Sequence, residues 1–583
     1  MVSYKDYPLD IVVPVSPRSH MSDSLLSGKS GQAMQVNNMV NLIDDPWIPV
    51  VRRDGTQEII APWEITGGTA PVLRLNAPRP DFNGALIQFL IGLAQTALPP
   101  GDNRDWRRRF KTPPPPDELK NAFAPYAHAF NFDGEGPRFM QDYDLSEGVE
   151  SSVDRLLMEM PGEQTLKLNT DHFLKRGTVG RICRRCCAMA LFTLQTNAPS
   201  GGRGHRTSLR GGGPLTTLVT GTTLWETVWL NVLPGDQFEI LGNAGKTADP
   251  DRFPWMGPTR TSTRNEVTAP IDVHPAQIFF SMPRRIRLDL DHPGSGTCDI
   301  CGCTSDRLVS RYLTKDGGVN YKGAWKHPLT PYYQPKNAKE PLPRHGQADG
   351  ISYRNWLGLV QNDPESLTQP ALAVQVFRNE RQRHLTDHLG YSAPLWAFGY
   401  KTDNMKVVCW NESTMPLIHV GEAVREQYEG VVTALIRTAD LVAGSTRNCI
   451  RKALFGDRKD AGGNIPEVDS RFWQDTESEF YAVLEALRET MEKGEDTTAL
   501  KLRWLSSISR EAMELFEAYS QADLISVADP RDIALSRRML RNYTSQRNKK
   551  IRNALDLPGE PDENDAKPGG TRKRSTKARG EHP

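Results

Sequence analysis

Apolar residues recur at helical spacing through the last quarter of the chain. One run holds Val424, Tyr428, Val431, Leu435, Ala439 and Val442, and similar runs follow over residues 480–491, 505–519 and 535–543. Apolar positions three or four residues apart fall on one face of an α-helix, which packs against a neighbouring helix. Four amphipathic helices in succession are most simply arranged as a four-helix bundle, which we expect over residues 416–555.

Residues 39–415 follow a less regular pattern. Two β-rich runs flank Asp54-Gly55, a strong hairpin signal, and apolar positions then predict a helix over residues 82–97. Further along, glycine, proline and short β-branched runs alternate. This predicts an irregular lobe of mixed α and β structure with long functional loops. The expected fold class is therefore α+β, with a mixed N-terminal lobe followed by the C-terminal bundle.

Both ends of the chain lack a pattern that could form a core. Residues 1–38 are rich in Ser, Pro and Gly, and we expect a disordered leader or a mis-assigned start, with Met34 and Met39 as alternative initiators. Residues 556–583 carry Pro, Gly and charge with few apolar side chains, which predicts a disordered charged tail.

The overall charge gives no bulk attraction to nucleic acid or membrane. The 583 residues include 72 Lys and Arg against 71 Asp and Glu, a net charge of +1, so any such partner must bind a local patch. The most apolar stretch, residues 84–98, is too short to span a bilayer, and the N-terminus does not resemble a signal peptide. Eight cysteines without a secretory signal indicate reduced thiols, so we expect a cytoplasmic protein with no membrane partner.

Four of the cysteines form two CxxC pairs, Cys183 with Cys186 and Cys298 with Cys301. Two such pairs supply four thiolates to one tetrahedral zinc ion even when they are far apart in sequence. We therefore expect a structural Zn²⁺ that staples the loop region of the mixed lobe. With four thiolates and no open position, such an ion would hold structure and perform no catalysis.

Other uses of the cysteines stay open. The two pairs could be unrelated buried thiols, or one of them could be a redox pair. Cys187 and Cys303 could each replace a neighbouring ligand. Cys409 and Cys449 lie in apolar contexts that are typical of core residues.

Basic residues concentrate around the first cysteine pair. Between residues 167 and 210 the only acid is Asp171, and the bases are Lys167, Lys175, Arg176, Arg181, Arg184, Arg185, Arg203, Arg206 and Arg210. Glycines in the stretch SGGRGHRTSLRGGG let the backbone approach a ligand closely, and arginine beside them can contact phosphate or a groove. No Walker-type Gly-Lys-Ser/Thr follows, so we favour nucleic acid over a nucleotide. The alternative is a solvated loop with incidental charge.

A second hairpin is expected in the segment GYKTDNMKVVCW, which begins at Gly399. Its tip carries Asn404, Met405 and Lys406. A small amide and a flexible apolar group on a protruding tip could wedge a duplex, although an ordinary turn has the same pattern. No HExxH, GxSxG or nuclease-like carboxylate cluster accompanies these features, and His388 beside Asp387 is an isolated pair. The residues thus favour a binding protein over an enzyme.

Taken in order, these motifs resemble the large subunit (CasA) of the type I-E CRISPR surveillance complex, Cascade. The similarity begins at NLIDDPWIPV and continues through GEGPRFMQD, the first cysteine pair, SLRGGGPLTTLVTG, the second cysteine pair, GAWKHPLTPY and GYKTDNMK. It covers residues 39–555 and leaves out the leader and the tail. The ordered combination is specific, whereas no single motif would be.

The resemblance implies a non-catalytic subunit that binds the protospacer-adjacent motif (PAM) of invading double-stranded DNA and starts strand separation for R-loop formation. The implied partners are the other Cascade subunits, the guide crRNA, the PAM-containing double-stranded DNA and a recruited helicase-nuclease. By position, the PAM-reading glycine loop is Ser200, Gly201, Gly202, Arg203 and Gly204, the minor-groove lysine is Lys315, and the strand wedge is Asn404 with Met405 and Lys406. Phe173, with Lys175, matches the contact to the 5′ handle of the guide, and Cys183, Cys186, Cys298 and Cys301 match a zinc site found in some members.

Two other classes of function stay open. A zinc-containing nuclease or nucleic-acid-modifying enzyme would cleave or modify its substrate, whereas a binding subunit would return it intact. A purely structural scaffold would bind without PAM dependence. The last expected helix carries Arg537, Arg538, Arg541, Arg547, Lys549, Lys550 and Arg552, which fit either phosphate binding or a solvated face.

Overall fold

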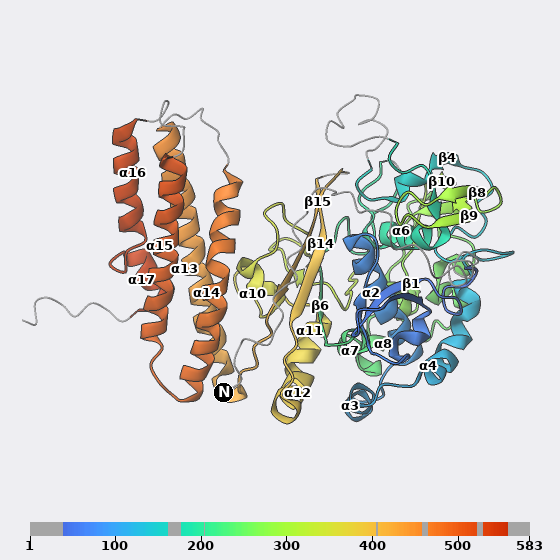
Figure 1. Cartoon of the computed structure of the whole chain (residues 1–583), viewed down its shortest axis with the longest axis horizontal. Helices are drawn as coiled ribbons and strands as arrows, with labels where there is room; N and C mark the ends of the chain where they lie inside the picture. The colour runs from blue at the N-terminus through green and yellow to red at the C-terminus, as the bar shows by residue number, and fades with distance from the viewer. Residues whose placement is uncertain are drawn as a thin grey trace, which may run out of the picture.

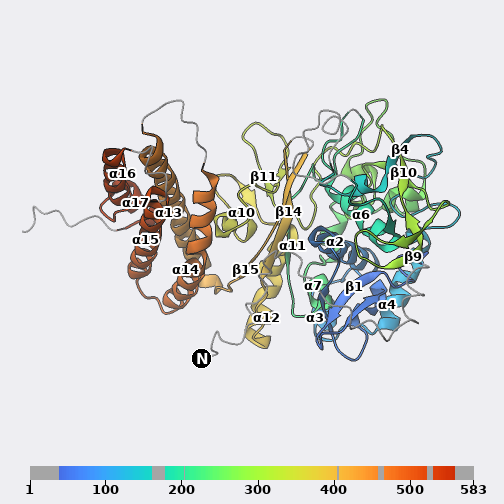
Figure 2. The ribbon, with the colours of Figure 1, turned by 45° about the horizontal axis from the view of Figure 1, so that its top comes forward.

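The computed structural model describes residues 39–160, 177–202, 204–403, 406–456, 465–521 and 529–557. Long helices gather at one end of the molecule, and short strands, helices and loops fill the other end (Figure 1). A long hairpin of β14 (Leu395–Asp403) and β15 (Lys406–Met415) lies between them in both views (Figures 1 and 2). The α+β prediction is confirmed.

The mixed lobe begins with a small antiparallel sheet in the order β2-β1-β3. Its strands are β1 (Ile48–Arg52), β2 (Gln57–Ile60) and β3 (Val72–Leu75). The expected turn at Asp54-Gly55 joins β1 to β2, and Gly55 has a φ of +85°, which glycine adopts at little cost.

The expected helix at residues 82–97 is α2 (Pro80–Ala97), and it runs through the core of this lobe. Phe89 of α2 is fully buried and makes edge-to-face ring contacts with Trp47, Phe130, Phe139, Phe192 and Phe280. Helix α6 (Arg184–Asn197) is also almost wholly buried, and it packs against α2. The terminal residues of α6, Arg184 and Asn197, are both buried.

Two further three-stranded sheets lie around α6. One has the order β4-β10-β7 and consists of β4 (Val149–Ser152), β7 (Arg285–Leu288) and β10 (Arg311–Lys315). The other has the order β5-β9-β8 and consists of β5 (Ile182–Cys183), β8 (Gly294–Thr297) and β9 (Thr304–Val309). Only Ser310 separates β9 from β10, so the two sheets are directly connected.

The part of the β14–β15 hairpin that begins at Leu395 packs in the core of the mixed lobe. Strand β14 pairs with β15 on one side and with β6 (Thr216–Val219) on the other, and Leu395 lies opposite Val219. A Cβ atom on Gly84 of α2 would lie only 2.8 Å from the Phe398 ring, so the hairpin presses directly on the helix backbone. The paired positions continue outward to Asp403 and Lys406.

Short elements complete the mixed lobe. The helices are α3 (Asn103–Lys111), α4 (Pro116–Phe123), α7 (Leu224–Leu230), α8 (Gly235–Glu239), α9 (Asp249–Arg252), α10 (Trp356–Leu359), α11 (Leu372–Val376) and α12 (Gln382–Leu389). The remaining sheet has the order β12-β11-β13 and consists of β11 (Tyr332–Tyr333), β12 (Leu342–Pro343) and β13 (Thr368–Gln369).

Every helical run expected in the last quarter forms a helix. The elements are α13 (Glu422–Phe455), α14 (Pro466–Glu492), α15 (Thr498–Gln521), α16 (Pro530–Tyr543) and α17 (Lys549–Leu555). Helix α13 is central, because it contacts each of the other four. The Trp504 indole N–H of α15 donates a 3.0 Å hydrogen bond to the Leu435 carbonyl of α13.

The segment around Tyr353 joins the helical end to the mixed lobe. Tyr353 is fully buried, stacks on Phe480 with ring centroids 4.3 Å apart, and shares a 2.7 Å hydrogen bond with the Thr476 hydroxyl. Buried apolar residues therefore form one continuous cluster across both ends of the molecule. Among the residues that the structure describes, no helix combines the length and the apolar character needed to cross a membrane.

Candidate cysteine centre and nucleic-acid groove

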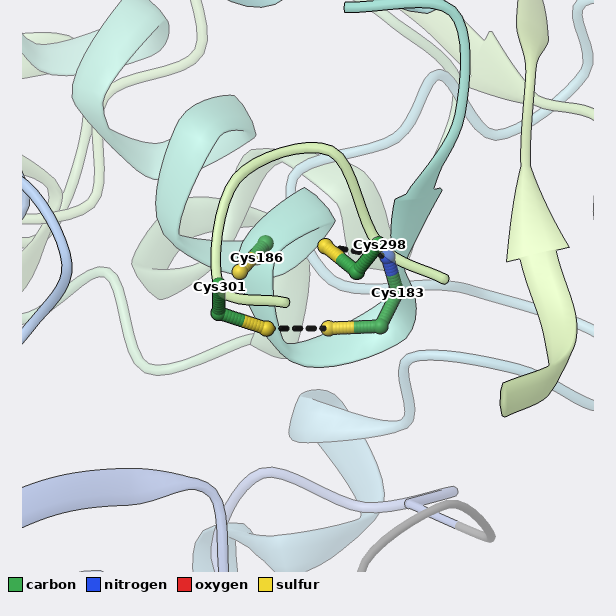
Figure 3. A group of neighbouring side chains, drawn as sticks. All are labelled: Cys183, Cys186, Cys298 and Cys301. Atoms are coloured by element: carbon green, nitrogen blue, oxygen red, sulfur yellow. Dashed lines mark hydrogen bonds between the residues drawn. The ribbon is translucent and has the colours of Figure 1, made fainter. Parts of the chain in front are cut away.

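The two CxxC pairs meet at the N-terminal end of α6. Cys183 ends β5 and Cys186 lies in the first turn of α6, while Cys298 and Cys301 lie in the turn between β8 and β9. The four Sγ atoms all lie within 4.8 Å of one another, and Figure 3 shows the four side chains facing a common centre.

Backbone hydrogen bonds hold this cluster together. The Cys183 N–H donates to Cys298 Sγ at 3.3 Å, and the Cys298 N–H donates to the Cys303 carbonyl at 2.8 Å. Asp299 also ties the two pairs, because its carboxylate accepts from the Gly180 and Arg181 N–H groups at 2.8 and 2.9 Å. The thiols are thus positioned by main chain as well as by side-chain packing.

The donor set fits a tetrahedral ion that prefers sulfur. Zn–S bonds of about 2.3 Å place the four sulfurs of such a site about 3.8 Å apart. The Cys183 and Cys301 Sγ atoms are 3.7 Å apart. Four cysteines that could hold a metal ion are therefore present where the CxxC pairs predict them.

The other two nearby thiols have different surroundings. Cys187 is fully buried in the apolar core, and burial raises the pKa of its thiol well above the ordinary value, which keeps it protonated. Cys303 Sγ lies 3.3 Å from Cys301 Sγ, at the edge of the cluster. Neither belongs to the group of four whose sulfurs are mutually close.

A groove of about 840 Å³ opens beside the other end of α6. Its lining includes Ser200, Gly201 and Gly202, which follow α6, together with Lys315 at the end of β10 and Lys406 at the start of β15. These residues come from three separate parts of the sequence. The structure thus brings together on one groove Ser200, Gly201 and Gly202 of the predicted glycine loop, the predicted Lys315 and Lys406 of the predicted hairpin, whereas Gly204 is described but does not line the groove.

Several predicted site residues lie outside the described part of the chain. They are Phe173, Lys175, Arg203, Asn404 and Met405. Their neighbours Gly202, Gly204, Asp403 and Lys406 are described, and Asp403 and Lys406 pair directly across the hairpin.

Cationic groups predominate in the groove. Besides the two lysines, the described lining holds Arg155 and Arg284 against the carboxylates of Glu147 and Asp316, together with the imidazole of His205. The lining also includes the apolar side chains of Leu157, Met158, Met160, Leu194 and Ile286. Cationic and apolar side chains on one groove suit a polyanion whose phosphates contact the cations and whose bases or sugars contact the apolar groups.

The glycine loop is closed by its own backbone. The Gly201 N–H donates to the His205 carbonyl and the His205 N–H donates to the Gly202 carbonyl, both at 3.3 Å. Gly202 has a φ of +91°, and a Cβ atom there would meet nothing within 4 Å. The backbone at Gly202 therefore faces open space, where a ligand can approach it closely.

Arg284 braces this loop from beneath. Its guanidinium donates to the Pro199 carbonyl, and a Cβ atom on Gly201 would lie 2.1 Å from Nη1, so a larger residue at position 201 would displace this guanidinium. Gln195 of α6 bonds both the N–H and the carbonyl of Arg284 at 3.0 Å. Burial lowers the pKa of Arg284 to about 10, which leaves the guanidinium charged at neutral pH.

The interpretation of residues 167–210 as one basic surface patch is wrong for two of its arginines. Arg184 is 4% exposed and pairs with Asp133, and Arg210 is 2% exposed and donates to Gln88 at 2.7 Å. Both are structural. Conversely, the sequence analysis did not single out Arg155 or Arg284 as groove residues, and the Arg284-Arg285 doublet at the start of β7 is a signal that could have found Arg284.

Together these features define an α+β protein with a helical end, a cysteine centre and a cationic groove. The sequence model of the CRISPR-associated protein Cse1 family matches residues 41–515, and the chain belongs to this family. A curated relative, the CRISPR-associated protein CasA/Cse1 of Thermus thermophilus, is 30% identical over 207 residues. That match spans 33% of this chain and 39% of the relative's length.

Solved structures of the same family share the fold over most of the chain. Thermus thermophilus CasA has a TM-score of 0.65 at 18% identity and covers 86% of this chain and 99% of its own. Thermobifida fusca Cse1 also has a TM-score of 0.65 at 18% identity, with 90% and 99% coverage. A chain from a structure titled CRISPR RNA-guided surveillance complex gives 0.59 at 16% identity, with 87% and 99% coverage.

Proposed function

We propose that this chain is the large, non-catalytic subunit of a type I-E Cascade complex, and that its groove binds the PAM of double-stranded DNA. One observation carries the proposal: Gly201, Gly202, Lys315 and Lys406, assigned from the sequence to PAM reading and strand opening, line a single cationic groove. Family membership and the likeness to a chain of a CRISPR RNA-guided surveillance complex support the assembly. Its partners are then the other Cascade subunits and the guide crRNA in the cytoplasm, with a helicase-nuclease recruited after DNA binding.

The division of labour follows from the chemistry of each part. Pairing between guide and target reads the protospacer sequence, while the protein reads only the short PAM. The exposed backbone at Gly202 is thin enough to enter a minor groove, and Lys315 supplies charge beside it. Because the minor groove mainly distinguishes A·T from G·C pairs, we expect several PAM sequences to be accepted.

The β14–β15 hairpin supplies the opening step in this proposal. Asp403 and Lys406 are paired, so Asn404 and Met405 are the two residues between the strands, and we assign them as the wedge. Lys406 lines the groove and would hold an adjacent phosphate. Opening the first base pairs costs a few kcal/mol, which an inserted tip offsets by contacts with the separated bases.

Other parts take supporting roles in the same proposal. The four cysteines hold a structural zinc ion, Phe173 and Lys175 contact the 5′ handle of the guide, and residues 39–415 and 416–555 act as separate recognition and bundle domains. Arginine and lysine side chains of α16 and α17 face nucleic acid or a neighbouring subunit.

The test of the function compares duplexes that differ only in the pairs flanking the protospacer. The assembled wild-type complex should bind them with different affinities and return the DNA intact and unmodified. Affinity that ignores the flanking pairs would favour a scaffold, and cleaved or modified DNA in the absence of a helicase-nuclease would favour an enzyme.

The wedge has a separate test. Asn404→Ala with Met405→Ala should leave PAM-duplex binding nearly intact and slow R-loop formation on linear DNA. Negative supercoiling, or a pre-opened bubble beside the PAM, should restore the rate because either supplies the missing opening energy. If the double variant weakened binding to fully paired and bubble targets equally, the hairpin would be a simple DNA contact and would not act as a wedge.

A further inference from the structure

The glycine loop and the Lys315 strand end are bonded to each other away from the groove surface. The Gly204 carbonyl accepts hydrogen bonds from the N–H groups of Gly317 and Gly318 at 3.0 and 3.4 Å. Gly317 and Gly318 follow Lys315 by only two and three residues, so movement of the loop must carry the lysine with it.

A third segment connects the same two elements through Ser262. This serine lies in the loop between Met256 and Pro270 and is 3% exposed. Its N–H donates to the Gly317 carbonyl at 3.1 Å, and its hydroxyl donates to the Gly318 carbonyl at 2.7 Å. The same hydroxyl accepts from Arg206 Nε at 2.8 Å. The Ser262 hydroxyl therefore bonds both Arg206, two residues after the glycine loop, and Gly318, three residues after Lys315.

The segments cross with no spare room. A Cβ atom on Gly204 would lie 2.6 Å from the Cβ of Asp316, and one on Gly318 would lie 1.9 Å from the Pro283 carbonyl oxygen. Real Cβ atoms do not approach other atoms so closely, so glycine is required at both crossings. The loop and the strand end are thus in close backbone contact at Gly204, and the Ser262 hydroxyl adds a second connection through Arg206 and Gly318.

We infer that Ser262 is a specificity-determining positioning residue, which locks the glycine loop and Lys315 into one rigid unit for reading a DNA groove. The inference rests on the proposed function, because it concerns how finely the same groove discriminates base pairs. Ser262 does not line the groove among the described residues, so its effect is exerted through the two elements that it joins.

Rigidity matters here because discrimination depends on repulsion as well as attraction. A wrong base pair is rejected when its protruding groups meet backbone that cannot retreat. A loop released from Ser262 can shift away from such a clash, which raises affinity for the wrong duplex more than it lowers affinity for the right one. Phosphate contacts, which set the salt dependence, are unaffected.

The first experiment measures binding of the assembled complex to a preferred and a disfavoured PAM duplex. Ser262→Ala should reduce the affinity ratio about fivefold, as expected for one lost hydrogen-bonding hydroxyl, with an unchanged salt slope. Ser262→Thr keeps the hydroxyl and should retain the ratio. Ser536→Ala, which removes a buried hydroxyl of α16, is the matched control and should leave the ratio unchanged.

A second variant tests the connection itself. Arg206→Ala removes the donor on the loop side, so its effect on the affinity ratio should not add to that of Ser262→Ala in the double variant. Additive effects would mean that the two residues act separately, and an unchanged ratio in Ser262→Ala would overturn the inference.

Amide hydrogen exchange of the full chain without DNA provides a readout independent of binding. Ser262→Ala should accelerate exchange at Gly317 and Gly318 and in the glycine loop together, while the helical end is unaffected. If the exchange rates were unchanged, the inference that Ser262 couples the two elements would be wrong, whatever the DNA-binding result. If the wild-type complex shows no preference between duplexes, the proposed function fails, and the exchange result still decides whether Ser262 couples the two elements.

Discussion

The two ends of helix α6 differ in what they position. At its N-terminal end, Cys183 and Cys186 are buried and face two further thiols from the β8–β9 turn. At its C-terminal end, the chain leaves the core and exposes Ser200, Gly201 and Gly202 to a cationic groove. We call the end of α6 at Cys183 and Cys186 the closed end, because these thiols are buried. We call the end that leads to Ser200, Gly201 and Gly202 the open end, because these residues are exposed.

The second cysteine pair is likewise connected to the groove, through the strands that follow it. Cys301 precedes β9, and β9 leads through β10 to Lys315 at the groove. Each cysteine pair is therefore followed along the chain by residues that line the groove, through α6 after the first pair and through β9 and β10 after the second. The cysteine cluster and the groove therefore use different residues, so substitutions at the two places should have separable effects.

Removal of a thiol at the closed end should have the largest effect. Purified wild-type protein should carry about one zinc ion per chain, and Cys298→Ser should lose it. Loss of a structural metal should lower the free energy of unfolding by more than about 4 kcal/mol. Metal analysis and denaturant unfolding measure the two quantities. Cys449→Ser, in a buried site of α13, is the control, and wild-type protein without metal when purified free of chelators would contradict the site.

At the open end, Gly202→Asp should weaken DNA binding with little loss of stability. A carboxylate in the groove repels phosphate and should cost at least about tenfold in affinity. The left-handed backbone at Gly202 adds only about 1 kcal/mol of strain. Gly202→Asn introduces the same shape without the charge, so the difference between the two variants isolates the repulsion. Equal affinities of Asp and Asn variants would place the loop away from DNA.

How much of the fold and of the candidate site could be predicted depends on how far apart in sequence the interacting residues lie. The hairpin at Asp54-Gly55, the helix α2 and the helices α13 to α16 rest on local spacing, and each was predicted. The cysteine cluster joins pairs that are 115 residues apart, yet it was predicted, because each CxxC pair is a local signal and two such pairs together complete a four-thiolate site.

The missed features depend on partners far along the chain. Arg184 is buried against Asp133, 51 residues away, and Arg210 against Gln88, 122 residues away. Nothing near either arginine distinguishes it from a surface cation. Arg284 is likewise defined by Gln195 and Pro199, which lie 89 and 85 residues earlier. Its role emerges only when β7 is placed beside the end of α6.

Lys315→Ala should have a moderate effect that is confined to the open end. Loss of one cation near phosphate should reduce the steepness of the salt dependence by about one unit on the log–log plot and leave metal content unchanged. Binding measured over a range of salt concentrations gives the slope. Lys493→Ala, an exposed lysine at the end of α14, is the control, and an unchanged slope in Lys315→Ala would remove Lys315 from the interface.

The smallest effect is expected from the spare thiol of the closed end. Cys303→Ser should retain about one metal ion per chain and change the free energy of unfolding by less than about 1 kcal/mol, because Cys303 lies outside the group of four. Metal analysis decides the question directly. Loss of the ion in Cys303→Ser would mean that Cys303 is a ligand.

The β14–β15 hairpin has a consequence for where DNA opening would begin. Its base is fixed in the core beside Gly84, so the reach of its tip is set by strand length alone. Each residue added to both strands advances the tip by about 3.4 Å, which is also the rise of one base pair in B-DNA. Because side chains alternate between faces, only even additions would keep the tip in the same orientation. If the tip is the wedge, lengthening both strands by two residues would move the point of DNA opening by two base pairs.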